Sequence, residues 1–204
     1  MNRPKVLLLT SSLLVDRVFV HTNLIESLDR YGETIVWAVS RGDDQNSSVW
    51  KNSLARVEDF PHVEPFKAFP YVYLRRLNEF VWDFRHRIPT RISVRQHVQD
   101  KNQLPSVRAL KLPARALAMC RAEQLLEDRL ENLLLSYPRS AEAEKRLREI
   151  RPSVIVVTGA FQFEQPAIFA AAKNLGIPTL AYIPSWDNIT TKNRMVFKYD
   201  GYLV

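Results

Sequence analysis

The sequence predicts an α/β protein with a doubly wound parallel sheet, and three observations support this fold class. Residues 5–10, KVLLLT, form an apolar run without alternation, which is typical of a strand buried on both faces. The runs at 34–40 and 153–158 repeat this pattern. Apolar residues at helical spacing follow the first and third runs, and strand–helix–strand units of this kind form right-handed parallel crossovers.

Residues 1–45 form the first predicted unit of strand, helix and strand. The helix is predicted because Val20, Leu24 and Leu28 recur at helical spacing. Gly32 is placed at the C′ position, where a left-handed glycine commonly ends a helix.

Residues 151–204 form the second predicted unit. Pro166 is suited to the first position of its helix, and Gly176 to the end. Strands are predicted at 179–183 and again from residue 201.

A basic helical insertion is predicted at 46–150, between the two units. Because the insertion divides one sheet, residues 1–204 are predicted to form a single Rossmann-like domain. The expected helices of the insertion cover 70–86, 112–135 and 140–150.

Composition excludes several classes of protein. Cys120 is the single cysteine, which excludes a disulfide framework and a cysteine-based zinc site, and its place in an apolar helix predicts a core position. The four histidines show no ligand spacing, so no metal is expected. No apolar run reaches the length of about 18 residues that crosses a membrane. A cytoplasmic location is therefore expected.

The loop after the first strand argues against the common nucleotide cofactors. Its sequence, LLLTSSLLVDRVF, has no glycine, so the backbone cannot approach a pyrophosphate as it does in G-x-G-x-x-G. The sequence also lacks G-x-x-x-x-G-K-[ST], G-x-S-x-G and H-E-x-x-H. No cofactor is expected.

Ligands of open α/β sheets bind beyond the carboxyl ends of the strands, which selects the loops at 10–17, 158–165 and 184–192. The first two loops carry polar side chains that either bind a ligand or satisfy the start of the following helix. These side chains are Ser12, Asp16, Arg17, Glu164 and Gln165.

The third loop is the richest in polar groups. Trp186 offers a flat apolar face for a sugar ring, and Lys192 offers a charge for phosphate. The alternative is an Asx-turn beside a half-buried tryptophan. The predicted binding residues are Ser185, Trp186, Asn188, Thr190 and Lys192, and Asp187 lies among them.

The segment SWDNITTKNR, preceded by GIPTLAYIP and followed by YDGYLV, resembles the Ser-Trp-Asp-Asn-x-Thr-x-Lys-Gly segment of bacterial surface-carbohydrate biosynthesis proteins. These proteins are similar to capsular polysaccharide and CDP-glycerol glycerophosphotransferase-type transferases, which have two Rossmann-like domains in the GT-B architecture. The resemblance covers 152–204, is topological over 1–40 and is absent over the insertion. Asn193 stands where the family usually has glycine.

The resemblance implies the N-terminal, acceptor-side half of a glycosyltransferase, with a second Rossmann-like domain beyond residue 204. The implied reaction moves a sugar from a nucleotide-sugar donor to a surface glycan or lipid-linked acceptor, without a metal. A base must deprotonate the acceptor hydroxyl. Asp187 is the first candidate base and Glu164 the second, followed by Asp16 and His21. This half alone is expected to be inactive.

Three alternative functions stay open. The chain could belong to a glycerophosphotransferase or to an NDP-sugar epimerase of the same architecture. It could also be a non-catalytic module that binds anionic lipid or a protein partner.

The positive charge of the chain is concentrated in the insertion. The net charge is +7, and residues 67–121 contain twelve Lys or Arg against three Asp or Glu. This segment suits an anionic membrane surface, nucleic acid, or simply a solvated helix face. A membrane at its cytoplasmic face is favoured over nucleic acid, because no nucleic-acid module is recognisable and the flanking fold resembles an envelope-sugar transferase.

Overall fold

A computed structural model describes most of the chain in two compact units. Unit 1 comprises Met1–Pro65, Pro138–Pro184 and Tyr199–Val204, and unit 2 comprises Phe66–Tyr137 and Ser185–Lys198. Within these limits the structure describes residues 3–10, 13–38, 50, 53–63, 69–94, 105–136, 140–159, 166–183, 185, 194–195 and 197–204.

Unit 1 is built on a six-stranded sheet in which all neighbouring strands are parallel. The strand order is β3-β2-β1-β4-β5-β6, which confirms the predicted doubly wound α/β fold. The strands are β1 (Lys5–Leu9), β2 (Glu33–Ala38), β3 (Arg56–Asp59), β4 (Val154–Val157), β5 (Thr179–Tyr182) and β6 (Gly201–Leu203).

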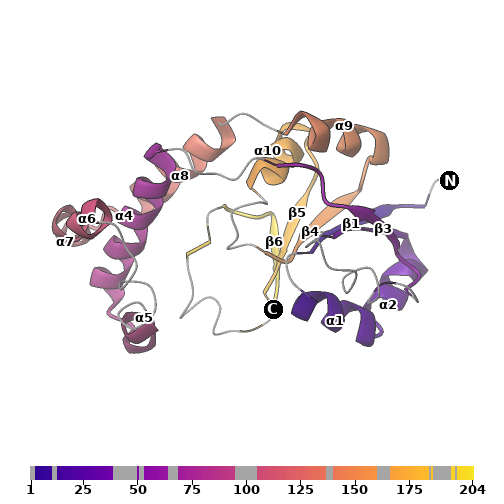
Figure 1. Ribbon diagram of the computed structural model, residues 1–204, viewed down its shortest axis with the longest axis horizontal. Helices are drawn as coiled ribbons and strands as arrows, with labels where there is room; N and C mark the ends of the chain where they lie inside the picture. Colours follow the sequence, from indigo (N-terminus) through magenta and orange to yellow (C-terminus); the bar gives the residue numbers. More distant parts are fainter. Residues whose placement is uncertain are drawn as a thin grey trace. The chain divides into compact units, whose positions relative to one another are not determined.

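Helices cover both faces of this sheet (Figure 1). One face carries two helices from the N-terminal part of the chain, and the other carries two from the C-terminal part. This burial on both faces explains why the central strands are continuous apolar runs. The helices of unit 1 are α1 (Leu13–His21), α2 (Leu24–Tyr31), α9 (Ala141–Ile150) and α10 (Pro166–Asn174).

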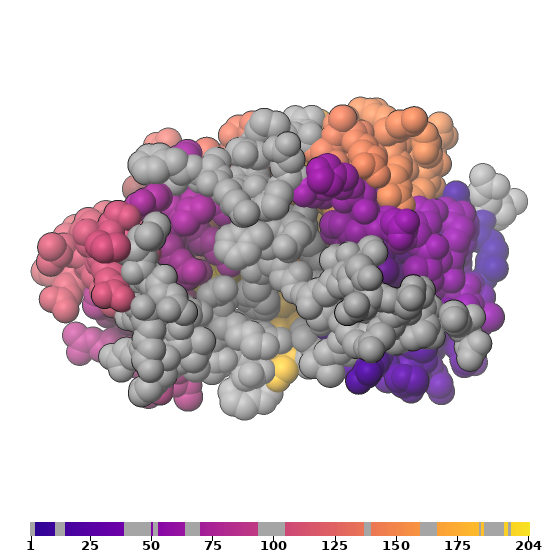
Figure 2. All heavy atoms as spheres, viewed as in Figure 1, coloured from indigo at the N-terminus to yellow at the C-terminus, as the bar shows by residue number. Residues whose placement is uncertain are grey.

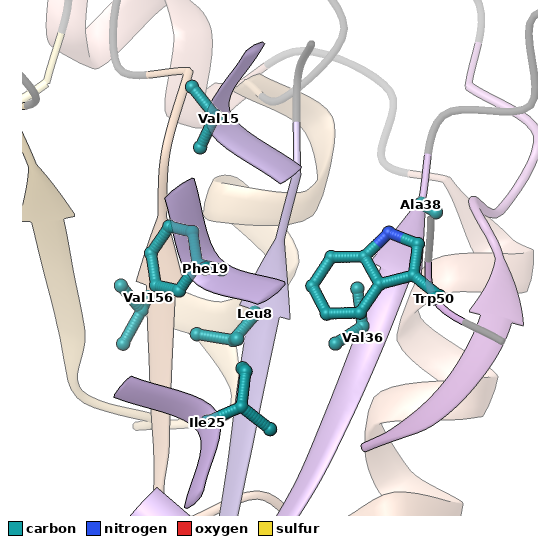
Figure 3. Packing of buried hydrophobic residues seen from close by; sticks show 8 residues of the cluster. All are labelled: Leu8, Val15, Phe19, Ile25, Val36, Ala38, Trp50 and Val156. Carbon is teal, nitrogen blue, oxygen red and sulfur yellow. The ribbon is translucent and has the colours of Figure 1, made fainter. Parts of the chain in front are cut away.

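A hydrophobic cluster fills the space between the sheet and α1 and α2. Figure 3 shows Phe19 of α1 over Leu8 and Val156, and Trp50 beside Val36. Leu8 pairs with Val36 on one side and with Val156 on the other, so the cluster joins the three central strands. These strands are therefore fixed to each other and to α1.

The strand β3 was not predicted, and it lies within 46–150, the range assigned to the helical insertion. Its four residues, RVED, are short and mostly exposed, as is common for edge strands that must avoid further pairing. Glu58 of β3 accepts hydrogen bonds from Trp37 Nε1 at 3.1 Å and Arg146 Nη2 at 2.7 Å. Side-chain contacts of this kind are not visible in a four-residue polar run.

The helix α9 begins where the sequence predicts, and it carries two side-chain pairs spaced i, i+4. Ser140 caps it by accepting a hydrogen bond from Ala143 N at 3.2 Å. Arg146 lies 3.7 Å from Glu142, and Arg148 lies 2.7 Å from Glu144, which are the expected i, i+4 pairs. Figure 2 shows α9 in orange next to the purple β3 segment, which its Arg146 contacts.

Gly32 ends α2, but not through the left-handed conformation that the prediction assumed. Its φ is −164°, in the extended region that any residue adopts. A side chain is excluded for a different reason: an added Cβ would lie 2.2 Å from the carbonyl oxygen of Pro4. Gly176, in contrast, has a φ of +67° after α10, as expected for a C-terminal glycine.

Unit 2 is helical. A hydrophobic cluster joins Phe80 and Val81 to Ala114, Ala118 and Leu126. Its helices are α4 (Phe69–His86), α5 (Pro89–Val94), α6 (Pro105–Ala109), α7 (Lys111–Met119) and α8 (Glu123–Ser136).

The predicted single helix at 112–135 is wrong, because the chain turns between α7 and α8. Arg121 adopts a left-handed conformation with a φ of 54°, which ends the helical path. The predicted core position of Cys120 is also wrong, since this residue lies in the turn and is exposed. Among all helices in the described residues, none combines the length and apolar character needed to cross a membrane.

Candidate functional site

The carboxyl ends of β1 and β4 meet at the centre of the sheet, where the strand order reverses. Ligands of doubly wound folds bind beyond the sheet at this position. Thr10 follows β1 and donates its backbone N–H to Trp37 O at 3.1 Å. Thr158 follows β4, and its hydroxyl donates to Leu9 O at 2.8 Å. Both threonines are buried, so they fix the ends of the two strands.

Asp16 lies beside this edge, in the first turn of α1. It is only 3% exposed. Burial raises the pKa of its carboxyl above the ordinary value, and the polar side chains of Thr10 and Trp50 oppose part of that rise. Trp50 is thus close enough to favour the charged form, although its Nε1 makes no hydrogen bond of normal geometry to any described residue.

One carboxylate oxygen of Asp16, Oδ1, has no hydrogen-bond partner within the described part of the chain. A buried acceptor without a partner costs about 1–3 kcal/mol, so such atoms are rare unless water or a ligand satisfies them. Oδ1 of Asp16 thus retains acceptor capacity beside the carboxyl edge. Its raised pKa also suits a proton acceptor better than an ordinary aspartate.

The raised pKa of Asp16 predicts how stability depends on pH. A carboxyl whose folded-state pKa lies above its unfolded-state value binds its proton more tightly in the folded protein, so its favourable contribution is complete at low pH. That contribution is lost as pH rises through the folded-state pKa. We therefore expect Asp16→Asn to gain stability relative to the unaltered protein between pH 4 and pH 7, measured by chemical denaturation at both values.

Asp200 provides the control for this experiment. Hydrogen bonds from Thr179 N at 2.8 Å and Lys173 Nζ at 3.0 Å lower the pKa of Asp200. Asp200→Asn should therefore lose stability relative to the unaltered protein as pH rises from about pH 2 to about pH 5, since the lowered pKa places this change at more acidic pH than that of Asp16. Equal pH dependence in the two variants would contradict the assigned burial of Asp16.

The remaining predicted site residues are only partly covered by the structure. Arg17 and His21 are exposed on α1, and His21 ends that helix five residues beyond Asp16. Ser185 is half-buried and belongs to unit 2. The residues Ser12, Glu164, Gln165, Trp186, Asp187, Asn188, Thr190 and Lys192 lie outside the described residues.

Three residues of this edge were missed by the sequence prediction. Thr10 and Thr158 end two strands with related sequences, LLLT and IVVT, and this repeated terminal threonine was an available signal. Trp50 lies in the range assigned to the helical insertion, and nothing local indicates that it packs with Val36 and Ala38 of β2.

Several cations of unit 2 are engaged in internal ion pairs. Arg76 Nη1 lies 2.6 Å from Glu79, and Arg75 Nε lies 3.5 Å from the same carboxylate. Arg91 pairs with Asp83, and both are buried. A further pair joins Arg85 to Glu123 at 2.8 Å. The interpretation of these arginines as a solvated face is therefore wrong for the buried Arg75 and Arg91.

Arg194 lies two residues after the third predicted loop, 184–192, and packs on the helices of unit 2. Its guanidinium lies 3.5 Å from the centre of the Trp82 ring, and it pairs with Glu127. Burial, followed by the nearby charge of Arg91, lowers its pKa to about 10, while Glu123 opposes this shift. Arg194 thus anchors the end of the loop to α4 and α8.

An open pocket of about 500 Å³ lies at the amino ends of β4 and β5, lined in part by Arg148, Arg151 and Gly176. This is the edge opposite to the one where ligands of this fold bind. No group of three or more His, Cys, Asp or Glu that could hold a metal ion is found in the described part of the chain.

The fold and the carboxyl edge define a Rossmann-like α/β protein with a buried carboxylate at the reversal point of its sheet. No protein-family model, curated protein or solved structure matches the chain.

Proposed function

We propose that this chain is the acceptor-side domain of a GT-B-type glycosyltransferase, which moves a sugar from a nucleotide-sugar donor to a surface glycan or lipid-linked acceptor. Two features support the proposal: the resemblance of SWDNITTKNR to surface-carbohydrate transferases, and the place of that segment in the sequence, soon after the carboxyl end of β5. The observation that carries it is the Oδ1 of buried Asp16, which lies at the carboxyl edge and has no hydrogen-bond partner among the described residues.

The reaction needs an acceptor hydroxyl, a donor and a base. The hydroxyl oxygen forms a bond to the anomeric carbon, and the bond from that carbon to the donor phosphate breaks, so the nucleoside diphosphate leaves with the bonding electrons. The hydroxyl proton goes to the base, for which Asp187 is the first candidate and Glu164 the second. Asp16 accepts a hydrogen bond from another acceptor hydroxyl and so orients the acceptor.

The effect of Asp16→Asn on the two Michaelis constants tests the acceptor-side assignment. Loss of a hydrogen bond to a charged group costs about 1.5–3 kcal/mol, so the KM for the acceptor should rise at least about tenfold. The KM for the donor should stay unchanged. The assay uses the complete protein encoded by the gene, with Asp200→Asn as a control carboxylate that leaves both constants unchanged. A rise confined to the donor KM would contradict the assignment.

A further inference from the structure

The surface of α6 and α7 combines positive charge with exposed apolar side chains. From residue 105 to residue 121 the sequence has four Lys or Arg and no Asp or Glu. Leu112 and Met119 are 74% and 84% exposed, which is unusual for large apolar side chains. Both helices lie at the surface in Figure 2, where they are drawn in pink.

The two faces of α7 differ in character. Its inner face packs Ala114 and Ala118 against Phe80 and Val81 of α4. Its outer face carries Leu112, Arg115 and Met119, which are spaced i, i+3 and i+7 and so lie on one side of the helix. The two exposed apolar side chains therefore lie on the same side of the helix, with a cation between them.

The cations of this surface have different partners from those of α4 and α5. The guanidinium of Arg115 lies 5.2 Å from the centre of the Phe84 ring, and Lys111 Nζ lies 5.5 Å from that of Phe80. A ring orients a cation without cancelling its net charge. Arg115 and Arg121 form no ion pair with any carboxylate in the described part of the chain, whereas Arg75, Arg76, Arg85 and Arg91 all do.

We propose that the outer face of α6 and α7, residues 105–121, binds the surface of a bilayer that contains anionic lipid. Clustered cations are attracted to anionic headgroups, and exposed aliphatic side chains between them can enter the boundary with the acyl chains. Single-stranded nucleic acid fits less well, because its binding surfaces present aromatic side chains for base stacking, and Leu112 and Met119 are aliphatic. The membrane contact is thus assigned to one helical face, residues 105–121, rather than to the whole basic insertion. It does not depend on the proposed reaction.

Vesicle co-sedimentation of the 204-residue chain tests this proposal. The vesicles contain phosphatidylcholine alone, or phosphatidylcholine and phosphatidylglycerol in equal amounts. The chain should sediment with the second kind only, and less so as salt is raised. Each cation near an anionic surface contributes about fivefold to binding, so Arg115→Glu with Arg121→Glu should weaken it at least about 25-fold.

Two further variants separate a bilayer from other anionic partners. Leu112→Ser with Met119→Ser changes only exposed side chains, so the fold is retained, and binding should fall about tenfold because apolar surface is lost. Arg30→Glu with Lys145→Glu lowers the net charge as much as the arginine variant does, but at exposed positions in unit 1. This control should bind within about twofold of the unaltered chain, because the changed charges lie outside the proposed binding surface.

The outcomes are distinct. Binding that is lost in both the arginine and the apolar variants, and kept in the control, supports the bilayer. Loss of binding in the arginine variant with full binding by Leu112→Ser/Met119→Ser would overturn the proposal. That result would indicate a polyanionic partner that is bound through charge alone. No binding by the unaltered chain, or equal losses in all variants, would overturn it as well.

Discussion

Asp187→Asn is expected to lower the turnover of the complete protein by about 10²- to 10⁴-fold while the protein stays folded. The proposed reaction needs a base for the acceptor hydroxyl, and Asp187 lies five residues beyond the end of β5, in the segment that resembles surface-carbohydrate transferases. Asparagine has the shape of aspartate but cannot take a proton. The measurement is kcat with saturating donor and acceptor, accompanied by circular dichroism to confirm the fold.

Two other carboxyl variants show whether the loss of turnover is specific to Asp187. Glu164→Gln should lower kcat less than Asp187→Asn, and Asp16→Asn should act mainly on the KM of the acceptor. If Asp187→Asn keeps most of its turnover while Glu164→Gln loses it, Glu164 is the base instead. If Asp187→Asn unfolds the protein, Asp187 has a structural role and is removed from the mechanism.

Arg91→Ala is expected to destabilise unit 2 by about 3–5 kcal/mol, because it leaves the buried carboxylate of Asp83 without its ion-pair partner. Arg91 is 3% exposed, so water cannot replace the lost guanidinium. Chemical denaturation, followed by far-ultraviolet circular dichroism, measures the change in the free energy of unfolding.

Arg148→Ala is the matched control for this prediction. Arg148 also pairs with a carboxylate, Glu144 at 2.7 Å, but its side chain is 62% exposed. Exposed pairs contribute at most about 1 kcal/mol, so this variant should be nearly as stable as the unaltered protein. Arg91→Met with Asp83→Leu should be more stable than Arg91→Ala, because it removes both charges. A cost for Arg91→Ala no larger than that for Arg148→Ala would show that the pair has little structural importance.

The sheet could be predicted from the sequence because its signals are local. Runs such as KVLLL and VIVV are buried on both faces, and only strands of a covered parallel sheet tolerate this composition. The cap of α9 at Ser140 and the proline at the start of α10 are also encoded within one helical turn. Each of these features depends on a few neighbouring residues.

The features that were missed depend on contacts between distant residues. The strand β3 is stabilised by pairing with β2 and by Arg146, which is 88 residues from Glu58. In unit 2 the burial of Arg75 and Arg91 was missed because it depends on tertiary packing, although their partners Glu79 and Asp83 are close in the sequence.

The candidate site shows the same division between local and distant information. Asp16 was selected because it follows the first strand, but its pKa is raised by burial in the folded protein, and Trp50, which opposes part of that rise, is 34 residues away. The sequence therefore identifies Asp16 as a candidate, but it does not predict the burial or the pKa of its carboxyl. The two threonines at the strand ends were missed although their positions repeat.

Product formation by the complete protein, assayed against a panel of nucleotide sugars and CDP-glycerol with glycan and lipid-linked acceptors, tests the central claim most directly. We expect one nucleotide sugar to be consumed, with release of its nucleoside diphosphate and attachment of the sugar to the acceptor. Consumption of CDP-glycerol alone would contradict sugar transfer and indicate glycerophosphate transfer. Conversion of a nucleotide sugar without an acceptor would indicate epimerisation, and a folded protein that consumes no donor would contradict the transferase assignment.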